Sequence, residues 1–304
     1  MKNIYSGIFS IPVTPFNLDL SIDQKSLEKC FEFLVDKGSH GMLIPANVSE
    51  VSKLSDDEKK DILKTATEVV KEEIPIIAGV SANNVNSIIE NAKYAEGLGI
   101  QSVLMTPLLS FKHDSEFYDF YSEISRATNV NIWVQNNRPP DGNPIPPDIL
   151  IRIINEIDKV DFLKEETNHS GHMHQLIKDK CANKIKSIMG GGGGRRIIDE
   201  YRRGSDGLMP SGHMIEAHLK LWNELKMSKN NQINNDAINT WNLMLESLLF
   251  ELNFSYSAYK YFFWKRGIIK NYIVRNPIKS FMDEFDYIEA DRIFDNLNKN
   301  FFKI

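Results

Sequence analysis

Short apolar runs alternate with longer segments of helical periodicity along most of the chain. The run 41–44 is apolar throughout, which is typical of a strand that is buried on both faces. In the segment before it, Leu27, Phe31 and Leu34 recur at helical spacing, and Gly38 ends the pattern. By the same criteria, strands are expected at 7–12, 41–44, 74–80, 102–105, 131–134, 160–164, 186–189 and 207–209. Helices are expected to begin near residues 21, 55, 84, 115, 147, 172 and 195.

Eight strands that each precede a helix predict an α/β fold, a (β/α)8 or TIM barrel with parallel strands. After about residue 214 the pattern becomes purely helical and rich in aromatic residues. Helices are expected there at 215–226, 235–253, 255–265 and 287–302. The sequence therefore predicts a barrel over residues 1–214 and a C-terminal helical extension over 215–304, with the aromatic residues packed against the barrel or a neighbouring subunit.

The composition of the chain narrows its function. The 304 residues are 42% hydrophobic and 25% charged, with a net charge of −5 and no basic stripe of the kind that binds nucleic acid. No signal peptide and no apolar stretch long enough to cross a membrane stand out, so a cytoplasmic protein without membrane contact is expected. Cys30 and Cys181 are too few and too far apart for a disulfide framework or a zinc site, and the seven histidines form no recognised metal-ligand set.

Lys164 is the first candidate for chemistry, because it ends an apolar run and catalytic groups of a barrel collect at the ends of its strands. A lysine in a partly apolar site loses hydration that stabilises its ammonium form, and the neutral amine can then attack a carbonyl. The alternative is a lysine whose stem packs while its head reaches water. Glu166 points to the same face if the strand continues that far, either as a general acid or base or as an ionic partner of Lys164.

Three further polar or glycine-rich stretches follow expected strands. The turn 47–49 offers backbone N–H groups that can hold a carboxylate, although an ordinary turn is the alternative. Gln135 and Asn136 open a long polar segment after the fifth strand and are candidates for binding substrate hydroxyls. The five glycines of 190–194 indicate close approach of the backbone to a ligand.

Several motifs occur together in the same order as these strands. They are Val13–Phe16 (VTPF), Ala46–Glu50, Gln135–Arg138, Lys164 and the glycines 191–194. With this order, residues 5–215 resemble the dihydrodipicolinate synthase and N-acetylneuraminate lyase family of Schiff-base barrels. There, the corresponding motifs are VTPF, G-T/S-T-G-E, Y-N-x-P, the lysine of G-[IL]-K-[ED] and a glycine-containing turn after the seventh strand.

The resemblance implies roles for individual residues. Lys164 would form an imine with a small 2-keto acid or pyruvate, so neither a separate cofactor nor a metal is needed. Gly192 and Met209 would lie near this imine and contribute backbone atoms, and family habit implies a homotetramer. The turn implied to hold the substrate carboxylate consists of Asn47, Val48 and Ser49.

The chain also departs from the family pattern at positions that matter for the reaction. Gln135 stands where the family usually has its catalytic tyrosine, and Leu108 and Leu109 stand where it has paired tyrosines after the fourth strand. Pro140 takes the place of the arginine that binds substrate in dihydrodipicolinate synthase. The phenol relay is therefore absent, and the lysine-pathway condensation is not expected.

Three motifs together resemble the L-2-keto-3-deoxyarabonate dehydratase branch: the Lys164-Glu165-Glu166 box, the strand segment 134–136 (VQN) and the segment 207–210 (GLMP). The expected function is a Schiff-base lyase that dehydrates a 2-keto-3-deoxy sugar acid to a product of the 2-oxoglutarate semialdehyde type. Lys164, Glu166 and Gln135 are its expected catalytic residues. A pyruvate-dependent aldolase of the N-acetylneuraminate lyase type and a non-catalytic keto-acid binder remain as alternatives.

Overall fold

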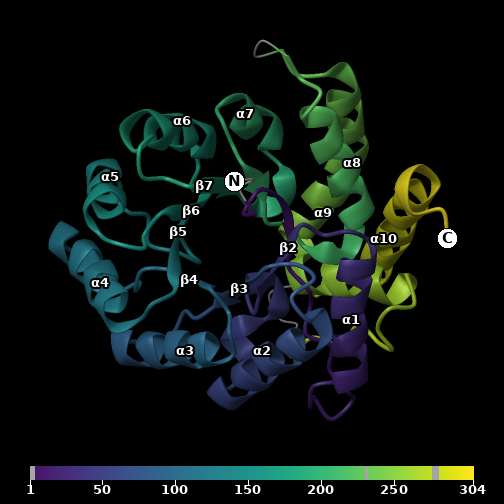
Figure 1. The fold of residues 1–304 in the computed structure, drawn as a ribbon. Helices are drawn as coiled ribbons and strands as arrows, with labels where there is room; N and C mark the ends of the chain where they lie inside the picture. Colours follow the sequence, from purple (N-terminus) through teal and green to yellow (C-terminus); the bar gives the residue numbers. More distant parts are fainter. Residues whose placement is uncertain (1–3, 230–231, 276–280) are drawn as a thin grey trace. The chain divides into compact units, whose positions relative to one another are not determined.

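The computed structural model describes residues 4–229, 232–275 and 281–304, and its strands form a closed parallel barrel in the order β1 to β8 (Figure 1). The strands are β1 (Gly7–Ser10), β2 (Gly41–Ile44), β3 (Ile76–Gly79), β4 (Ser102–Met105), β5 (Asn131–Asn137), β6 (Phe162–Glu166), β7 (Ser187–Gly190) and β8 (Gly207–Leu208). The helices are α1 (Gln24–Asp36), α2 (Asp56–Val70), α3 (Val85–Gly97), α4 (Asp114–Ala127), α5 (Pro147–Glu156), α6 (Ser170–Lys180), α7 (Ile197–Arg202), α8 (Ile215–Leu225), α9 (Asn235–Lys265) and α10 (Glu284–Leu297). The predicted TIM barrel is thus confirmed.

Strands β5 and β6 continue past their predicted ends. β5 extends to Asn137 and β6 to Glu166, with Gln135 opposite Lys164 and Asn137 opposite Glu166 in a parallel register. The strands were predicted from runs of apolar side chains. The hydrogen bonds between strands, however, are made by backbone N–H and C=O groups, and every residue except proline carries both. Polar residues therefore extend these two strands, and their side chains stand at the strand ends.

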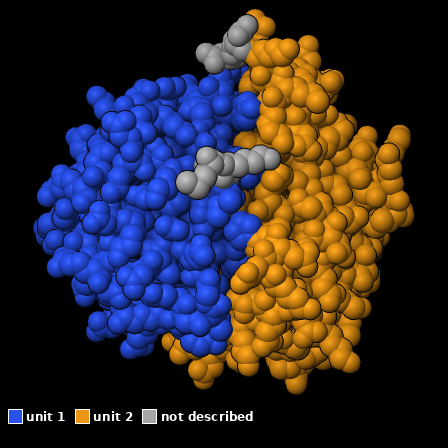
Figure 2. Space-filling view, viewed as in Figure 1, with its two compact units in different colours: residues 1–7, 75–209 blue, residues 8–74, 210–304 orange. Residues whose placement is uncertain are grey.

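The chain divides into two compact units, Met1–Gly7 with Pro75–Met209 and Ile8–Ile74 with Pro210–Ile304 (Figure 2). We call them the first and the second unit and describe each by itself. The domain boundary expected after residue 214 stays a prediction.

In the first unit, helices α3 to α7 lie outside strands β3 to β8 (Figure 1). Buried aromatic side chains fill the beginning of its strands: Trp133 stacks on Phe162 at 4.8 Å between ring centroids, and Tyr5 meets the edge of Phe162 at 5.0 Å. The Tyr5 hydroxyl accepts a hydrogen bond of 2.7 Å from Ser102 Oγ, so its polar end is satisfied. The apolar filling therefore lies at the strand starts, and the polar side chains lie at the strand ends.

In the second unit, α9 packs against α8, α10 and the 3₁₀ helix η1 (Asn47–Ser49). Ser255 adopts φ 43° and ψ −114° inside α9 and interrupts its helical geometry. The sequence predicted two helices separated at this point, and the structure has one element with a non-helical residue there.

A buried ion pair links α9 to the turn that follows β2. Lys260 and Glu50 are both fully buried and form an ion pair, and Lys260 Nζ also donates to Ile273 O at 2.8 Å. Glu50 has a positive φ of 56° at the end of η1 and accepts from the Arg275 backbone N–H at 3.0 Å. The helical extension thus fixes the turn that was predicted to hold the substrate carboxylate.

Replacing Lys260 by methionine is expected to lower the free energy of unfolding by roughly 3–5 kcal/mol, because Glu50 would keep a buried charge without its cation. Urea unfolding measures the loss, and Lys64→Met, which changes an exposed lysine, serves as the control. The double variant Lys260→Met/Glu50→Gln should recover much of the loss. A Lys260→Met protein as stable as the control variant would contradict this account of the pair.

Candidate active site

The structure brings the three predicted catalytic side chains together at the ends of β5 and β6. Lys164 is 4% exposed, and its Nζ lies 3.3 Å from Glu166 Oε2. This contact arises because residues two apart on a strand point to the same face. Gln135 Nε2 donates to the same Glu166 oxygen at 2.7 Å. Their contact is an observation, and their catalytic roles stay a prediction.

The carboxylate of Glu166 is held on both oxygens. The Gly192 backbone N–H donates to Oε1 at 2.9 Å. Burial acts to raise the pKa of Glu166, but the charge of Lys164 and the hydrogen bonds from Gly192 and Gln135 outweigh it and hold the pKa below its ordinary value. Glu166 is therefore a carboxylate at neutral pH, the form that can accept a proton.

The glycine run after β7 makes room for two glutamate side chains. A Cβ on Gly191 would lie 2.1 Å from Glu166 Oε1, and a Cβ on Gly190 would lie 2.0 Å from Glu200 Oε2. Gly192 adopts a positive φ of 56°, which points its N–H at Glu166 at no steric cost. The groups that approach Gly190 and Gly191 are carboxylates of the protein, and the predicted approach of this run to a ligand stays a prediction.

A row of hydroxyl groups continues the site across the neighbouring strand ends. Thr106, just after β4, donates from Oγ1 to Gln135 Oε1 at 3.4 Å. The Thr106 backbone N–H donates to Ser81 Oγ at 3.1 Å, and Ser81 follows β3. These contacts fix the Gln135 amide so that its NH2 group faces Glu166. Sequence analysis did not identify Thr106 or Ser81, although Thr106 directly follows β4 and Ser81 lies two residues after the end of β3.

The opposite face of β5 and β6 carries a second polar cluster. Asn136 and Glu165 are fully buried, and Asn136 Nδ2 donates to Glu165 Oε2 at 2.8 Å. Asn136 Oδ1 accepts from the Ile145 backbone N–H at 2.9 Å, and the Thr167 backbone N–H donates to Glu165 Oε1 at 2.8 Å. Glu165 thus faces away from Lys164, because successive residues of a strand point to opposite faces. Both ends of the Asn136 amide bond within the protein, so its role with substrate hydroxyls stays a prediction that these contacts do not support.

Glu200 of α7 is a buried carboxyl that sequence analysis did not identify. It is 2% exposed and accepts from Ser170 Oγ at 2.6 Å. Burial is the largest cause that raises the pKa of both Glu200 and Glu165 to about 7, and the negative charge of Glu166 acts in the same direction on both. Glu200 lies four residues after Arg196 in a short helix, and nothing in the linear pattern distinguishes it from a surface glutamate.

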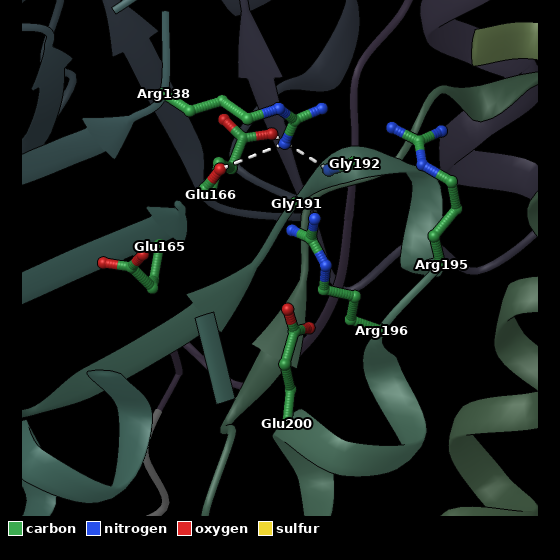
Figure 3. A pocket seen from close by; sticks show the side chains of 8 residues that line it. All are labelled: Arg138, Glu165, Glu166, Gly191, Gly192, Arg195, Arg196 and Glu200. Atoms are coloured by element: carbon green, nitrogen blue, oxygen red, sulfur yellow. Dashed lines mark hydrogen bonds between the residues drawn. The ribbon is translucent and has the colours of Figure 1, made fainter. Parts of the chain in front are cut away.

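Figure 3 shows a pocket beside Glu166 that is lined by β6, the segments that follow β5 and β7, and helix α7. Arg138 Nη1 donates to Glu166 O at 3.2 Å, and Arg196 Nη1 donates to Thr167 O at 2.9 Å. The residues that line the pocket are Arg138, Glu165, Glu166, Gly191, Gly192, Arg195, Arg196 and Glu200. Sequence analysis missed its arginines, although two of them directly follow the glycine run.

The remaining predicted site residues are placed as follows. Met209 is buried directly after β8, and its backbone N–H donates to Gly190 O at 2.9 Å. In the second unit, Ser49 is buried and donates from Oγ to Pro12 O at 2.7 Å, while Asn47 is exposed and Val48 half-buried. The turn predicted at 47–49 is present as η1, and its role in holding a carboxylate stays a prediction.

Two features are absent from the described residues. No group of three or more histidine, cysteine, aspartate and glutamate side chains in residues 4–229, 232–275 and 281–304 could hold a metal ion. No helix in that part of the chain is both long and apolar enough to span a membrane.

Comparison with known proteins shows extensive similarity. The sequence model of the dihydrodipicolinate synthetase family matches residues 4–289. A 4-hydroxy-tetrahydrodipicolinate synthase of Parabacteroides distasonis is 29% identical over 171 residues, which are 56% of this chain and 58% of that relative. The chain therefore matches less than two thirds of the length of this relative.

Two solved structures have the same fold. The dihydrodipicolinate synthase of Rhodopseudomonas palustris superposes with a TM-score of 0.88 at 22% identity and covers 97% of this chain and 99% of its own. The N-acetylneuraminate lyase of Fusobacterium nucleatum, solved with pyruvate, has a TM-score of 0.85 at 22% identity and covers 99% of this chain and 98% of its own.

The buried carboxyls Glu165 and Glu200 are expected to make stability fall as the pH rises. Between pH 4.5, their ordinary pKa, and about 7, the folded state keeps protons that the unfolded chain has released. We expect Glu200→Gln to reduce the loss of unfolding free energy between about pH 5 and about pH 8 by on the order of 3 kcal/mol. Urea unfolding at both pH values tests this, with Glu123→Gln on the exposed face of α4 as the control. Identical pH dependence in the two variants would show that Glu200 does not titrate in this way.

Proposed function

The chain belongs to the dihydrodipicolinate synthetase family, and from that premise we propose that it is a lyase that forms a Schiff base through Lys164 and dehydrates a 2-keto-3-deoxy sugar acid. Enzymes of this family use a lysine Schiff base with pyruvate and no metal ion. The observation that carries the proposal is the buried Lys164–Glu166 pair, 3.3 Å apart, with Gln135 bound to the same carboxylate.

In the proposed reaction, the Lys164 amine attacks the C2 carbonyl, and water leaves to give a protonated imine. The imine acidifies the C3 hydrogens, and Glu166 accepts one of these protons. The resulting enamine expels the C4 hydroxyl, which takes the proton from Glu166 and leaves as water. The conjugated imine then loses a C5 proton and takes up a proton at C3, and the enol formed at C4 and C5 becomes an aldehyde. Hydrolysis of the imine frees this product and restores the lysine.

Gln135 favours dehydration over cleavage. An amide does not exchange a proton with a substrate oxygen as a phenol can, so a proton relay at the C4 oxygen has no carrier at this position. Gln135 instead holds Glu166 Oε2 toward Lys164, and Thr106 fixes the other end of the amide. The ionised carboxylate of Glu166 would then stand next to the imine, where proton removal at C3 is needed.

A pyruvate-dependent aldolase of the N-acetylneuraminate lyase type is the second candidate. The similarity to the Fusobacterium nucleatum lyase solved with pyruvate favours it. Both reactions begin with the same imine, and they differ in whether the bond from C4 to oxygen or the bond between C3 and C4 breaks. A homotetramer and a cytoplasmic location are further parts of the proposal that stay predictions.

With 2-keto-3-deoxy-L-arabonate as test substrate, we expect a product that keeps all of the substrate carbons, namely 2-oxoglutarate semialdehyde, detected by NMR. Lys164→Ala should abolish turnover, and Glu166→Gln should lower kcat by about 10²–10⁴-fold because the general base is lost. Glu123→Gln is the matched surface control.

Other outcomes would select other functions. Pyruvate and glycolaldehyde as products would indicate the aldolase. Near-normal turnover by Glu166→Gln would remove Glu166 from proton transfer. Thermal stabilisation by keto acids without turnover of any of them would indicate a binding protein.

A further inference from the structure

Three arginines from two different segments converge on the pocket beside Glu166 (Figure 3). We propose that Arg138, Arg195 and Arg196 bind a second anionic group at the far end of the substrate, so that the preferred keto acid is a dicarboxylate or a phosphate ester. This inference rests on the proposed function, because it assigns the substrate of the same Lys164 site.

The backbone around Glu166 positions these guanidinium groups. Arg138 Nη1 donates to the carbonyl of Glu166 itself at 3.2 Å. Arg196 Nη1 donates to Thr167 O, one residue further along, at 2.9 Å. Arg195 lies over the turn that binds the Glu166 carboxylate, since a Cβ on Gly192 would stand 3.1 Å from its Nη2.

Hydrogen bonds to carbonyl oxygens orient a guanidinium without neutralising its charge. Among the ion pairs within 4.0 Å in the described part of the chain, none involves Arg138 or Arg196. Each of these two side chains has five N–H donors in a planar fork, and a backbone carbonyl takes a bond from only one nitrogen in each case. Both therefore keep charge and donor capacity for a ligand.

The charge balance of the pocket favours an anion once a carboxyl of its lining is protonated. The charged residues of the lining are the three arginines and the carboxyls Glu165, Glu166 and Glu200. Full ionisation of these carboxyls balances the arginines. Burial raises the pKa of Glu165 and Glu200 to about 7, so their protonation near neutral pH leaves an excess of positive charge. Arg138 and Arg195 are half-buried, so these two attract an anion more strongly than they would in water, whereas Arg196 is exposed.

The geometry of arginine defines the chemistry of the ligand. The guanidinium fork matches the two oxygens of a carboxylate or phosphate, and such charge-assisted bonds are stronger than bonds to neutral hydroxyls. Every 2-keto acid carries one carboxylate beside its keto group, and the anion proposed for the arginines is a second one. A keto acid with a neutral end would leave the guanidinium groups without this partner.

Borohydride trapping of the Lys164 imine, followed by intact mass, tests the inference with keto acids of equal length. In the wild type, half-maximal trapping should need a concentration of 2-oxoadipate about tenfold lower than that of 2-oxohexanoate, which ends in a methyl group. This ratio should fall toward one in Arg138→Ala and Arg196→Ala, and in the wild type at high salt. Arg202→Ala, an exposed arginine at the end of α7, should keep the wild-type ratio.

A second pair of substrates distinguishes the two kinds of anion. Preference for 2-keto-3-deoxy-6-phosphogluconate over 2-keto-3-deoxygluconate, lost in the same variants, would assign the pocket to phosphate, and preference for 2-oxoadipate alone would assign it to carboxylate. Ratios taken within one variant cancel any general loss of trapping. If a variant does not fold, Arg138→Lys and the salt dependence of the wild type replace it.

Several results would overturn the inference. Equal trapping of anionic and neutral keto acids by the wild type would do so, as would a preference that survives both arginine substitutions. If the variants lose trapping of pyruvate and of 2-oxoadipate to the same extent, the arginines bind the carboxylate beside the keto group. Absence of any adduct in the wild type would instead contradict the proposed function, and the inference with it.

Discussion

The contact between Lys164 and Glu166 is the interaction on which the rest of the site depends. It exists because β6 continues through Glu166 and places the two side chains on one face. Two buried charges are stable only when they are paired and hydrogen-bonded. Gln135 and the Gly192 N–H provide those bonds, and Gly191 lacks the side chain that would displace the carboxylate.

The same strand presents a different environment on its other face. Glu165 and Glu200 are buried without a cation within ion-pair distance in the described residues, and their pKa values rise to about 7. Glu166, one residue from Glu165, has a pKa below its ordinary value because Lys164 is beside it. Neighbouring glutamates thus differ in charge state at neutral pH, and only the one beside the lysine is fully ionised. Such separation of pKa values is a common property of sites that carry out proton transfer.

Much of the fold follows from patterns that are local in sequence. Apolar runs and helical periodicity identified every strand of the barrel, and the two-residue period of a strand predicted that Glu166 would face the same way as Lys164. The ends of β5 and β6 were missed because polar residues continue these strands through backbone hydrogen bonds. The break expected in the long helix was correct in place, since Ser255 is non-helical, although the element continues through it.

The parts of the site that sequence analysis missed are those that tertiary contacts create. Thr106 reaches Gln135 from the neighbouring strand, and Glu200 meets Gly190 from a helix that looks amphipathic in isolation. Arg138 was visible in the polar segment after β5, but nothing in the sequence indicates that it would bond to the carbonyl of Glu166. Contacts of this kind depend on the register of the strands and on the positions of the helices. Neither can be predicted from residues that are close together in the sequence.

Exchange of the methyl protons of pyruvate in D2O, followed by proton NMR, tests the central claim most directly. The account predicts that the wild type replaces these protons with deuterium, because the Lys164 imine acidifies them and Glu166 removes them. Glu166→Gln should still form the borohydride-trapped adduct, but its rate of proton exchange should be lower than that of the wild type by a factor of about 10² or more. Exchange at the wild-type rate in that variant would contradict the account, as would a wild-type imine that never exchanges.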